Sequence, residues 1–238
     1  MLATVGACSD GGDEGILVVK NVVPQIGCTF TGDSSELAFA TGEVNIHTTE
    51  GYLFAPQMQS RVISSMDDVQ SRTVITTGAN VDIEFADSTF GANVNADPAL
   101  THFNQPFSVP LAPIVNDSPS VADGSFTLIP QQLVDAIGNS QSGAGSAGAA
   151  EFSTLLLVDV QVLGTMSGND VSSQKFTYGV TVGNKIVVQE LGACPVTNGL
   201  VVNPGNACNV FQDGQVGCCR DTTNPDPINN LVCPAPTQ

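Results

Sequence analysis

The chain has 238 residues, of which 42% are hydrophobic and 12% are charged, so it can bury a sizeable core within one globular domain. It contains no run approaching the roughly 18 consecutive apolar residues that a membrane helix requires. The 23 acidic and 6 basic residues give a formal net charge of -17, which makes nucleic acids and anionic lipid surfaces poor partners.

The N-terminal ten residues contain a short apolar segment that closes on small residues before a cysteine. Val5-Gly6-Ala7-Cys8 resembles the lipobox of bacterial lipoproteins, in which the chain is cleaved before the cysteine and the cysteine is acylated. The usual basic region and most of the apolar run are missing ahead of these four positions, so the start lies further upstream or the precursor was trimmed. The resemblance implies a lipid on Cys8 that attaches the protein to a membrane.

The segment 9–15 is small, acidic and polar, which is typical of a flexible tether between a membrane surface and a folded body. Lipoproteins usually carry such a tether. Ser9, directly after the cysteine, resembles the signal that sorts lipoproteins to the outer membrane. We therefore interpret residues 1–15 as a signal-peptide remnant, lipidation site and tether, and expect the protein in the cell envelope, at the outer membrane or the cell surface.

Residues 16–192 alternate apolar and polar side chains over many short stretches, which predicts β-strands. In 81–87, for example, Val81, Ile83 and Phe85 would face a core while Asp82 and Glu84 face water. The strands that we expect are 16–23, 37–40, 44–48, 61–64, 73–76, 81–87, 125–129, 156–162 and 176–182. Many short strands separated by turn residues favour an all-β fold, an antiparallel β-sandwich of immunoglobulin-like or similar type.

Two local signals refine this fold. Gly183-Asn184 separates the strand 176–182 from the apolar run 186–188, and such a dipeptide predicts a tight hairpin. One short helix is expected after Pro130, with Leu133, Val134 and Ile137 on one side, ending at Gly138.

Three segments interrupt the strand pattern. The segment 87–124 contains five prolines and no sustained alternation, so we expect an irregular excursion that either caps the sandwich through Phe103 and Phe107 or binds a protein partner. The run 143–150 is a low-complexity loop tip. The tail 193–238 holds five of the seven cysteines among prolines, and its order should come from cross-links.

The last third of the chain resembles a known type of protein. Gly164, a turn, the segment 171–173, the alternating strand 176–182 and a cysteine-rich tail follow one another as in uncharacterised envelope lipoproteins of soil-dwelling Gram-negative bacteria. That family has no established activity, so the resemblance implies location and fold class. Its closely spaced cysteine pair at the end of the last strand is missing here, which leaves the pairing of Cys28 and Cys194 open.

Six cysteines remain if Cys8 carries a lipid, an even number that predicts three disulfides: Cys28, Cys194, Cys208, Cys218, Cys219 and Cys233. A bridge between the neighbours Cys218 and Cys219 would be strained, so each should have another partner. Two of Cys194, Cys208 and Cys233 would pair with them, and the third with Cys28. A zinc site is disfavoured because no C-x-x-C pair exists and both histidines are distant in sequence. Disulfides indicate the periplasm or the cell surface.

Catalytic motifs are weak. Gly32-Asp33-Ser34 and Gly168-Asn169-Asp170 resemble two blocks of the GDS-type esterases, but no histidine follows His102 and Ala99 stands where the partner aspartate would be. His47 lies in an alternating stretch and is interpreted as a strand histidine turned toward solvent. We therefore predict no catalytic residues.

Calcium is the one metal for which the chain has candidate ligands. Asp67-Asp68 and the acidic run 221–226 could supply oxygen atoms, but neither matches an EF-hand loop and both suit plain turns, so no metal site or cofactor is predicted. The sequence thus favours a lipid-anchored envelope protein with a non-enzymatic binding or structural role. The alternative is a secreted or periplasmic hydrolase whose site is not visible as a local motif.

Overall fold

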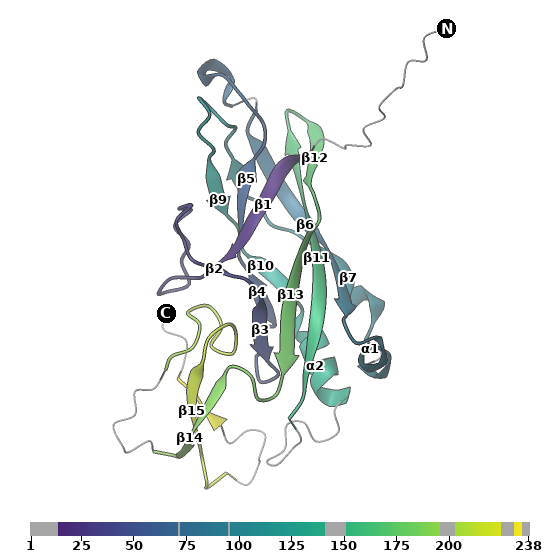
Figure 1. Cartoon of the computed structure of the whole chain (residues 1–238), viewed down its shortest axis with the longest axis vertical. Helices are drawn as coiled ribbons and strands as arrows, with labels where there is room; N and C mark the ends of the chain where they lie inside the picture. The colour runs from purple at the N-terminus through teal and green to yellow at the C-terminus, as the bar shows by residue number, and fades with distance from the viewer. Residues whose placement is uncertain are drawn as a thin grey trace.

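The computed structural model describes residues 14–70, 72–94, 96–140, 151–195, 203–224 and 231–234. The predicted lipidation site Cys8 and the low-complexity run 143–150 lie outside these ranges. The fold is mostly β, as expected, and its described part contains two α-helices (Figure 1). No helix of this part is long and apolar enough to cross a membrane.

The main sheet has eleven strands and is mixed rather than purely antiparallel. β13 pairs in parallel with β3, and β1 pairs in parallel with β12, whereas the other pairs of this sheet are antiparallel. Its path runs through β3 (Gly42–Asn45), β13 (Phe176–Gly183), β11 (Ser153–Met166), β12 (Asn169–Ser173), β1 (Glu14–Val22), β5 (Pro56–Ser60) and β9 (Val121–Asp123). Off this path lie β2 (Ala38–Phe39), β6 (Val74–Phe85), β7 (His102–Gln105) and β8 (Pro110–Leu111).

The pair β6 and β11 forms the long centre of this sheet. Alternation works as the sequence predicts, because Val81 and Ile83 of β6 are buried in the core with Val158 of β11. The predicted strands 73–76 and 81–87 are one continuous strand. The alternation of apolar and polar residues is interrupted between these two stretches. A β-bulge where Gly78 faces Leu163 absorbs the interruption, so the strand continues.

The core is closed by a second, two-stranded sheet and by helix α2. In this sheet β4 (Tyr52–Phe54) pairs with β10 (Phe126–Ile129). Helix α2 (Gln131–Ser140) buries Leu133, Val134 and Ile137, which confirms the predicted helix and its apolar side. Gly138 lies inside the helix rather than at its end, and a side chain there would meet only Ile46 at ordinary contact distance.

The segment 87–124 is more regular than the sequence predicted. It forms α1 (Ser88–Val94), the 3-10 helix η2 (Pro98–Leu100) and the edge strands β7, β8 and β9. The prolines do not prevent this, because Pro98 begins η2 and Pro110 begins the edge strand β8, where a missing N–H is tolerated. Phe107 does pack inward, stacking on Phe126 at a centroid distance of 4.9 Å.

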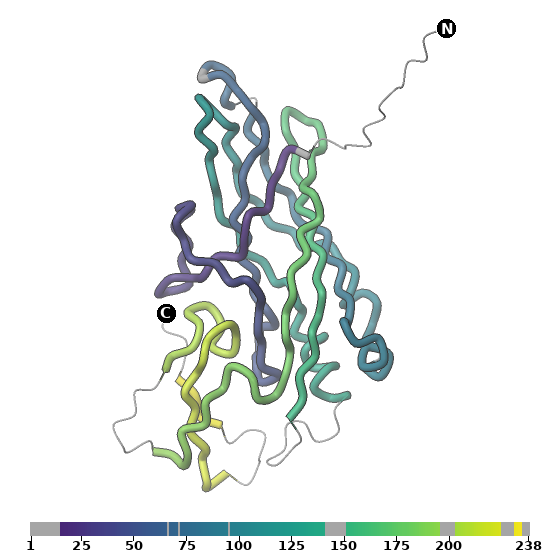
Figure 2. Tube along the Cα trace, viewed as in Figure 1, coloured from purple at the N-terminus to yellow at the C-terminus, as the bar shows by residue number. Residues whose placement is uncertain are grey.

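The C-terminal part forms a small lobe, the residues 188–195, 203–224 and 231–234, which Figure 2 shows beside the segment 23–39. It is not irregular throughout: β14 (Val188–Ala193), β15 (Val216–Arg220) and β16 (Leu231–Val232) form a three-stranded sheet. The hairpin predicted at Gly183-Asn184 is therefore wrong. Val187, at a φ of 66°, turns the chain away from β13, and β14 pairs in parallel with β15.

The predicted strand 61–64 is also misplaced, because the strand of that region is β5 and Ile63 makes only an isolated bridge to Ile114. The described residues form three disulfides, Cys28–Cys208, Cys194–Cys219 and Cys218–Cys233. Cys218 and Cys219 have different partners, and Cys28 binds the remaining tail cysteine. The first bridge joins the lobe to the segment 23–39, and the other two lie within the lobe.

Candidate functional site

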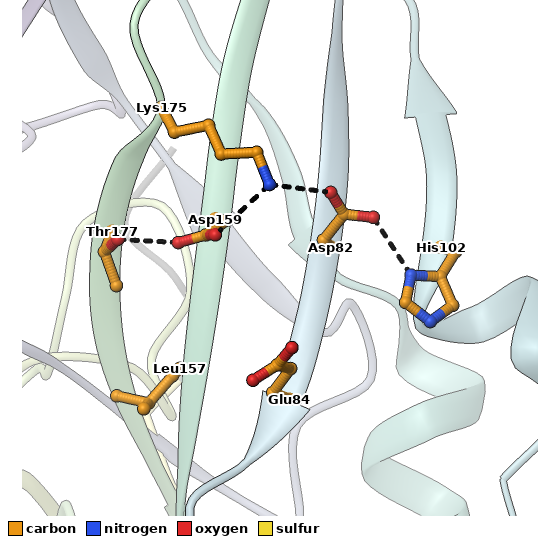
Figure 3. Close-up of a pocket in the computed structure, with 7 residues that line it drawn as sticks. All are labelled: Asp82, Glu84, His102, Leu157, Asp159, Lys175 and Thr177. Carbon is orange, nitrogen blue, oxygen red and sulfur yellow. Dashed lines mark hydrogen bonds and ion pairs between the residues drawn. The ribbon is translucent and has the colours of Figure 1, made fainter.

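A polar depression of about 210 Å³ lies on the outward face of the main sheet (Figure 3). Strands β6, β11, β13 and β7 position its side chains, because alternate residues of each strand point away from the core. Asp82 of β6 is in register with Asp159 of β11 and with His102 of β7, and Asp159 is in register with Thr177 of β13. The lining residues are Asp82, Glu84, His102, Leu157, Asp159, Lys175 and Thr177.

Short polar contacts join these side chains across the strands. Lys175 Nζ lies 3.7 Å from Asp82 Oδ2 and 3.5 Å from Asp159 Oδ2. Thr177 Oγ1 donates a hydrogen bond of 2.6 Å to Asp159 Oδ1. The Lys175 side chain is 59% exposed, so these ion pairs are screened by water and contribute at most about 1 kcal/mol each. These ion pairs therefore orient the side chains of Lys175, Asp82 and Asp159 and add little to the stability of the fold.

The depression also holds a histidine that is oriented by a carboxylate. His102 Nδ1 lies 2.9 Å from Asp82 Oδ1, a contact that holds the imidazole ring in one orientation. A base held in this way can accept a proton from a bound group. The hydroxyl that lines the same depression, that of Thr177, donates to Asp159 and not to the imidazole. With three carboxylates against one lysine, the depression favours cationic groups and hydrogen-bond donors.

The two GDS-like blocks are not brought together. Ser34 lies in the loop before β2, where its carbonyl oxygen accepts a hydrogen bond of 2.9 Å from Lys20 near the end of β1. Asn169 begins β12, which pairs with the other end of β1 at Glu14. The length of β1 therefore separates Ser34 from Asn169. The two residues do not lie in one site, as the esterase mechanism would require.

His47 is half-buried against the lobe rather than turned toward solvent. Its ring lies 6.3 Å from that of Phe211. Burial, together with the nearby Arg220 charge, lowers the pKa of His47, so the imidazole is neutral at neutral pH.

The acidic runs considered for calcium form turns in the described part of the chain. Asp68 lies in the 3-10 helix η1 (Met66–Asp68) and pairs with Arg72 at 3.1 Å. Asp221 accepts hydrogen bonds from the amide and the hydroxyl of Thr223. No cluster of three or more potential ligands suited to a metal occurs among the residues that the structure describes.

A second polar cluster is buried between the lobe and the described part of the chain that precedes it, which we call the body. Sequence reasoning missed this cluster. Tyr52 donates to Asp213 Oδ2 at 2.8 Å, and Asn21 Nδ2 donates to the hydroxyl oxygens of Tyr52 and Tyr178 at 3.1 and 2.9 Å. The backbone N–H of Glu43 donates to Asp213 Oδ1 at 2.7 Å. Asp213 is 161 residues from Tyr52, so no local pattern could have signalled this contact.

Burial controls the protonation of this cluster. It raises the pKa of Asp213 to about 6, although hydrogen bonds from Glu43, Tyr52 and Gln212 oppose the shift. Burial also raises the pKa of Tyr178 to about 12 and that of Tyr52 well above its usual value. Both phenols are therefore neutral hydrogen-bond donors at physiological pH.

No family model matches the chain, and no curated protein is significantly similar to it. The function must therefore be inferred from the residues and their geometry.

Proposed function

We propose that this protein is a lipid-anchored component of a bacterial cell envelope, attached through Cys8 at the outer membrane or the cell surface, with a non-enzymatic binding or structural role. The observation that carries the proposal is the set of three disulfides that pair six cysteines. Disulfides of this kind persist in oxidising compartments outside the cytosol. Cys8 remains outside this set, next to an acidic tether, as an anchor residue would.

We propose further that the two-stranded sheet and the main sheet form the two layers of a β-sandwich. Its support is aromatic packing between the two-stranded sheet and the main sheet. The ring of Phe54 on β4 lies 5.3 Å from that of Tyr178 and 6.1 Å from that of Phe176, both on β13. On this proposal the small sheet is the second layer, and the outer face of the main sheet is free to contact a partner.

The polar depression supports a binding role over an enzymatic one. Its volume of about 210 Å³ is below the roughly 300–1,000 Å³ of pockets that enclose small-molecule substrates. An open polar face of this size suits reversible recognition of a group on a larger partner.

Lipidation provides the decisive test of this proposal. Expressed behind a complete signal peptide, the protein should incorporate a labelled fatty acid and partition into the detergent phase. Cys8→Ser should abolish both, because only the cysteine that follows the lipobox is acylated. Cys233→Ser is the matched control and should keep the label, and labelling that survives Cys8→Ser would contradict the anchor.

A hydrolase is the second candidate, and the pair His102 and Asp82 favours it, because an oriented imidazole can activate a water molecule. If this is the function, the protein should hydrolyse members of a panel of chromogenic esters and glycosides. His102→Gln should remove that activity while His47→Gln keeps it. Hydrolysis that is unchanged in His102→Gln would eliminate this site as the catalyst.

A further inference from the structure

The most exposed large apolar side chains of the described residues gather in the segment 23–39. Ile26 is 88% exposed and Leu37 is 77% exposed. By contrast, the segment 87–124, for which the sequence left open a cap of the sandwich or a partner-binding loop, has no large hydrophobic side chain of comparable exposure in its described residues. Single exposed apolar side chains are common on protein surfaces, whereas exposed apolar groups that lie together mark interaction sites.

The segment 23–39 holds these side chains in a fixed position. Gln25 N donates to Thr29 O at 2.9 Å across a tight turn in which Gly27 has a φ of 76°. The disulfide Cys28–Cys208 then fixes this turn to the lobe. At the other end of the segment, Val23 N donates to Leu37 O at 2.9 Å. Ile26 is thus presented on an ordered turn, which reduces the entropy lost on binding.

Two grooves meet along this segment and share Val23 and Pro24. The first, of about 340 Å³, runs between the segment and the lobe and is mostly apolar. The second, of about 320 Å³, is lined by five polar and three apolar residues, and we call it the polar groove. The first is lined by Val23, Pro24, Ile26, Phe39, Pro204, Gly205, Asn206, Ala207, Asp213 and Gly214. The second is lined by Val23, Pro24, Gln25, Thr31, Asp33, Ser35, Glu36 and Leu37.

The polar groove is acidic at neutral pH. Hydrogen bonds from Ser35 lower the pKa of Asp33. Partial burial raises the pKa of Glu36, but hydrogen bonds from Thr31 outweigh this effect and lower it overall. The nearby ammonium of Lys20 is bound to the carbonyl oxygens of Ser34 and Glu36, beneath the loop. Both carboxylates of the groove are therefore charged.

We propose that the 23–39 surface, meaning the two grooves and Ile26 and Leu37 on their rim, is a docking site for a segment of a partner protein that carries apolar side chains flanked by lysine or arginine. The apolar groove and Ile26 take the apolar side chains, and Asp33 and Glu36 attract the basic ones. Charge complementarity selects this occupant over an anionic membrane surface, which the carboxylates and the overall charge of -17 would repel. This inference goes beyond the proposed anchoring and does not depend on the lipid.

The test uses the full chain with intact disulfides, labelled with 15N and titrated with the synthetic peptide acetyl-GSKLVKLSG-amide. Chemical-shift changes should cluster on residues 23–39 and 204–214 and weaken with added salt. A peptide with both lysines replaced by glutamate, and one with its three apolar residues replaced by serine, should each bind at least roughly tenfold more weakly.

Variants locate the site independently of the peptide controls. Ile26→Ser and Leu37→Ser should each weaken binding about tenfold, because each removes an apolar contact while leaving the fold unchanged. Ile63→Ser is the matched control, since Ile63 is 71% exposed but does not line either groove, and it should bind like the wild type.

Several outcomes would overturn the proposal: no binding of the peptide in the millimolar range, shifts confined to other surfaces, or equal binding by Ile26→Ser. Preferential binding of the protein to phosphatidylcholine–phosphatidylglycerol vesicles, lost in Ile26→Ser, would instead identify a membrane contact and would also overturn it. Failure of Cys8 lipidation would leave this result unaffected, so the two proposals fail separately.

Discussion

Asp213 is the residue whose environment has the clearest measurable consequence. Its carboxylate accepts hydrogen bonds from Tyr52, Gln212 and the backbone of Glu43, and those from Glu43 and Tyr52 join the lobe to strands β3 and β4. Burial nevertheless dominates and raises its pKa from 3.8 to about 6. The folded protein therefore binds a proton at Asp213 more readily than the unfolded chain does.

The sign of the resulting pH dependence follows from this shift. The protonated Asp213 contributes about 3 kcal/mol to the free energy of unfolding. This contribution is fully present below about pH 4 and is lost as the pH rises through about 6. Asp213→Asn should remove this dependence. The measurement is urea unfolding of both proteins across this pH range, because the difference between them cancels the other carboxylates. Parallel stability curves would show that Asp213 does not titrate in this window.

At the scale of elements, the sequence predicts the helices and strands in which apolar residues recur at the regular spacing of one buried side. Helix α2 and strand β11 lie where their patterns indicate, because each buries one regular side against the same core. The outward direction of Asp82, and of Asp159 within the predicted strand 156–162, follows from the same alternation. What could not be predicted was their meeting with His102 and Lys175, since that depends on which strands become neighbours.

The hairpin at Gly183-Asn184 shows why a strong local signal can fail. The side chain of Asn184 accepts a hydrogen bond of 3.0 Å from Phe152 N, which holds the end of β13 to β11. The following residues then pair with β15, where Val216 N donates to Val187 O at 2.7 Å. The disulfide Cys194–Cys219 reinforces this pairing. Long-range contacts thus outweigh a two-residue turn preference.

At the scale of the whole molecule, the body and the lobe have separate cores. The main core extends over the main sheet, the two-stranded sheet and α2, whereas the buried hydrophobic residues in the described part of the lobe are Val210, Val216 and Cys218. Because apolar burial in so small a core offsets little of the entropy lost on ordering the lobe, the disulfides and the polar contacts with the body also stabilise it.

Reduction of the disulfides should therefore loosen the lobe and leave the body folded. The bridge Cys28–Cys208 spans 180 residues, for which the chain-entropy model gives about 5 kcal/mol, and the bridges within the lobe span 25 and 15 residues and give about 3 kcal/mol each. Hydrogen exchange with and without reductant measures the effect. Amides of β14 and β15 should lose protection while those of β6 and β11 keep theirs, because the main core contains no cystine. Simultaneous loss in β6 and β11 would show that the body, too, depends on its cross-links.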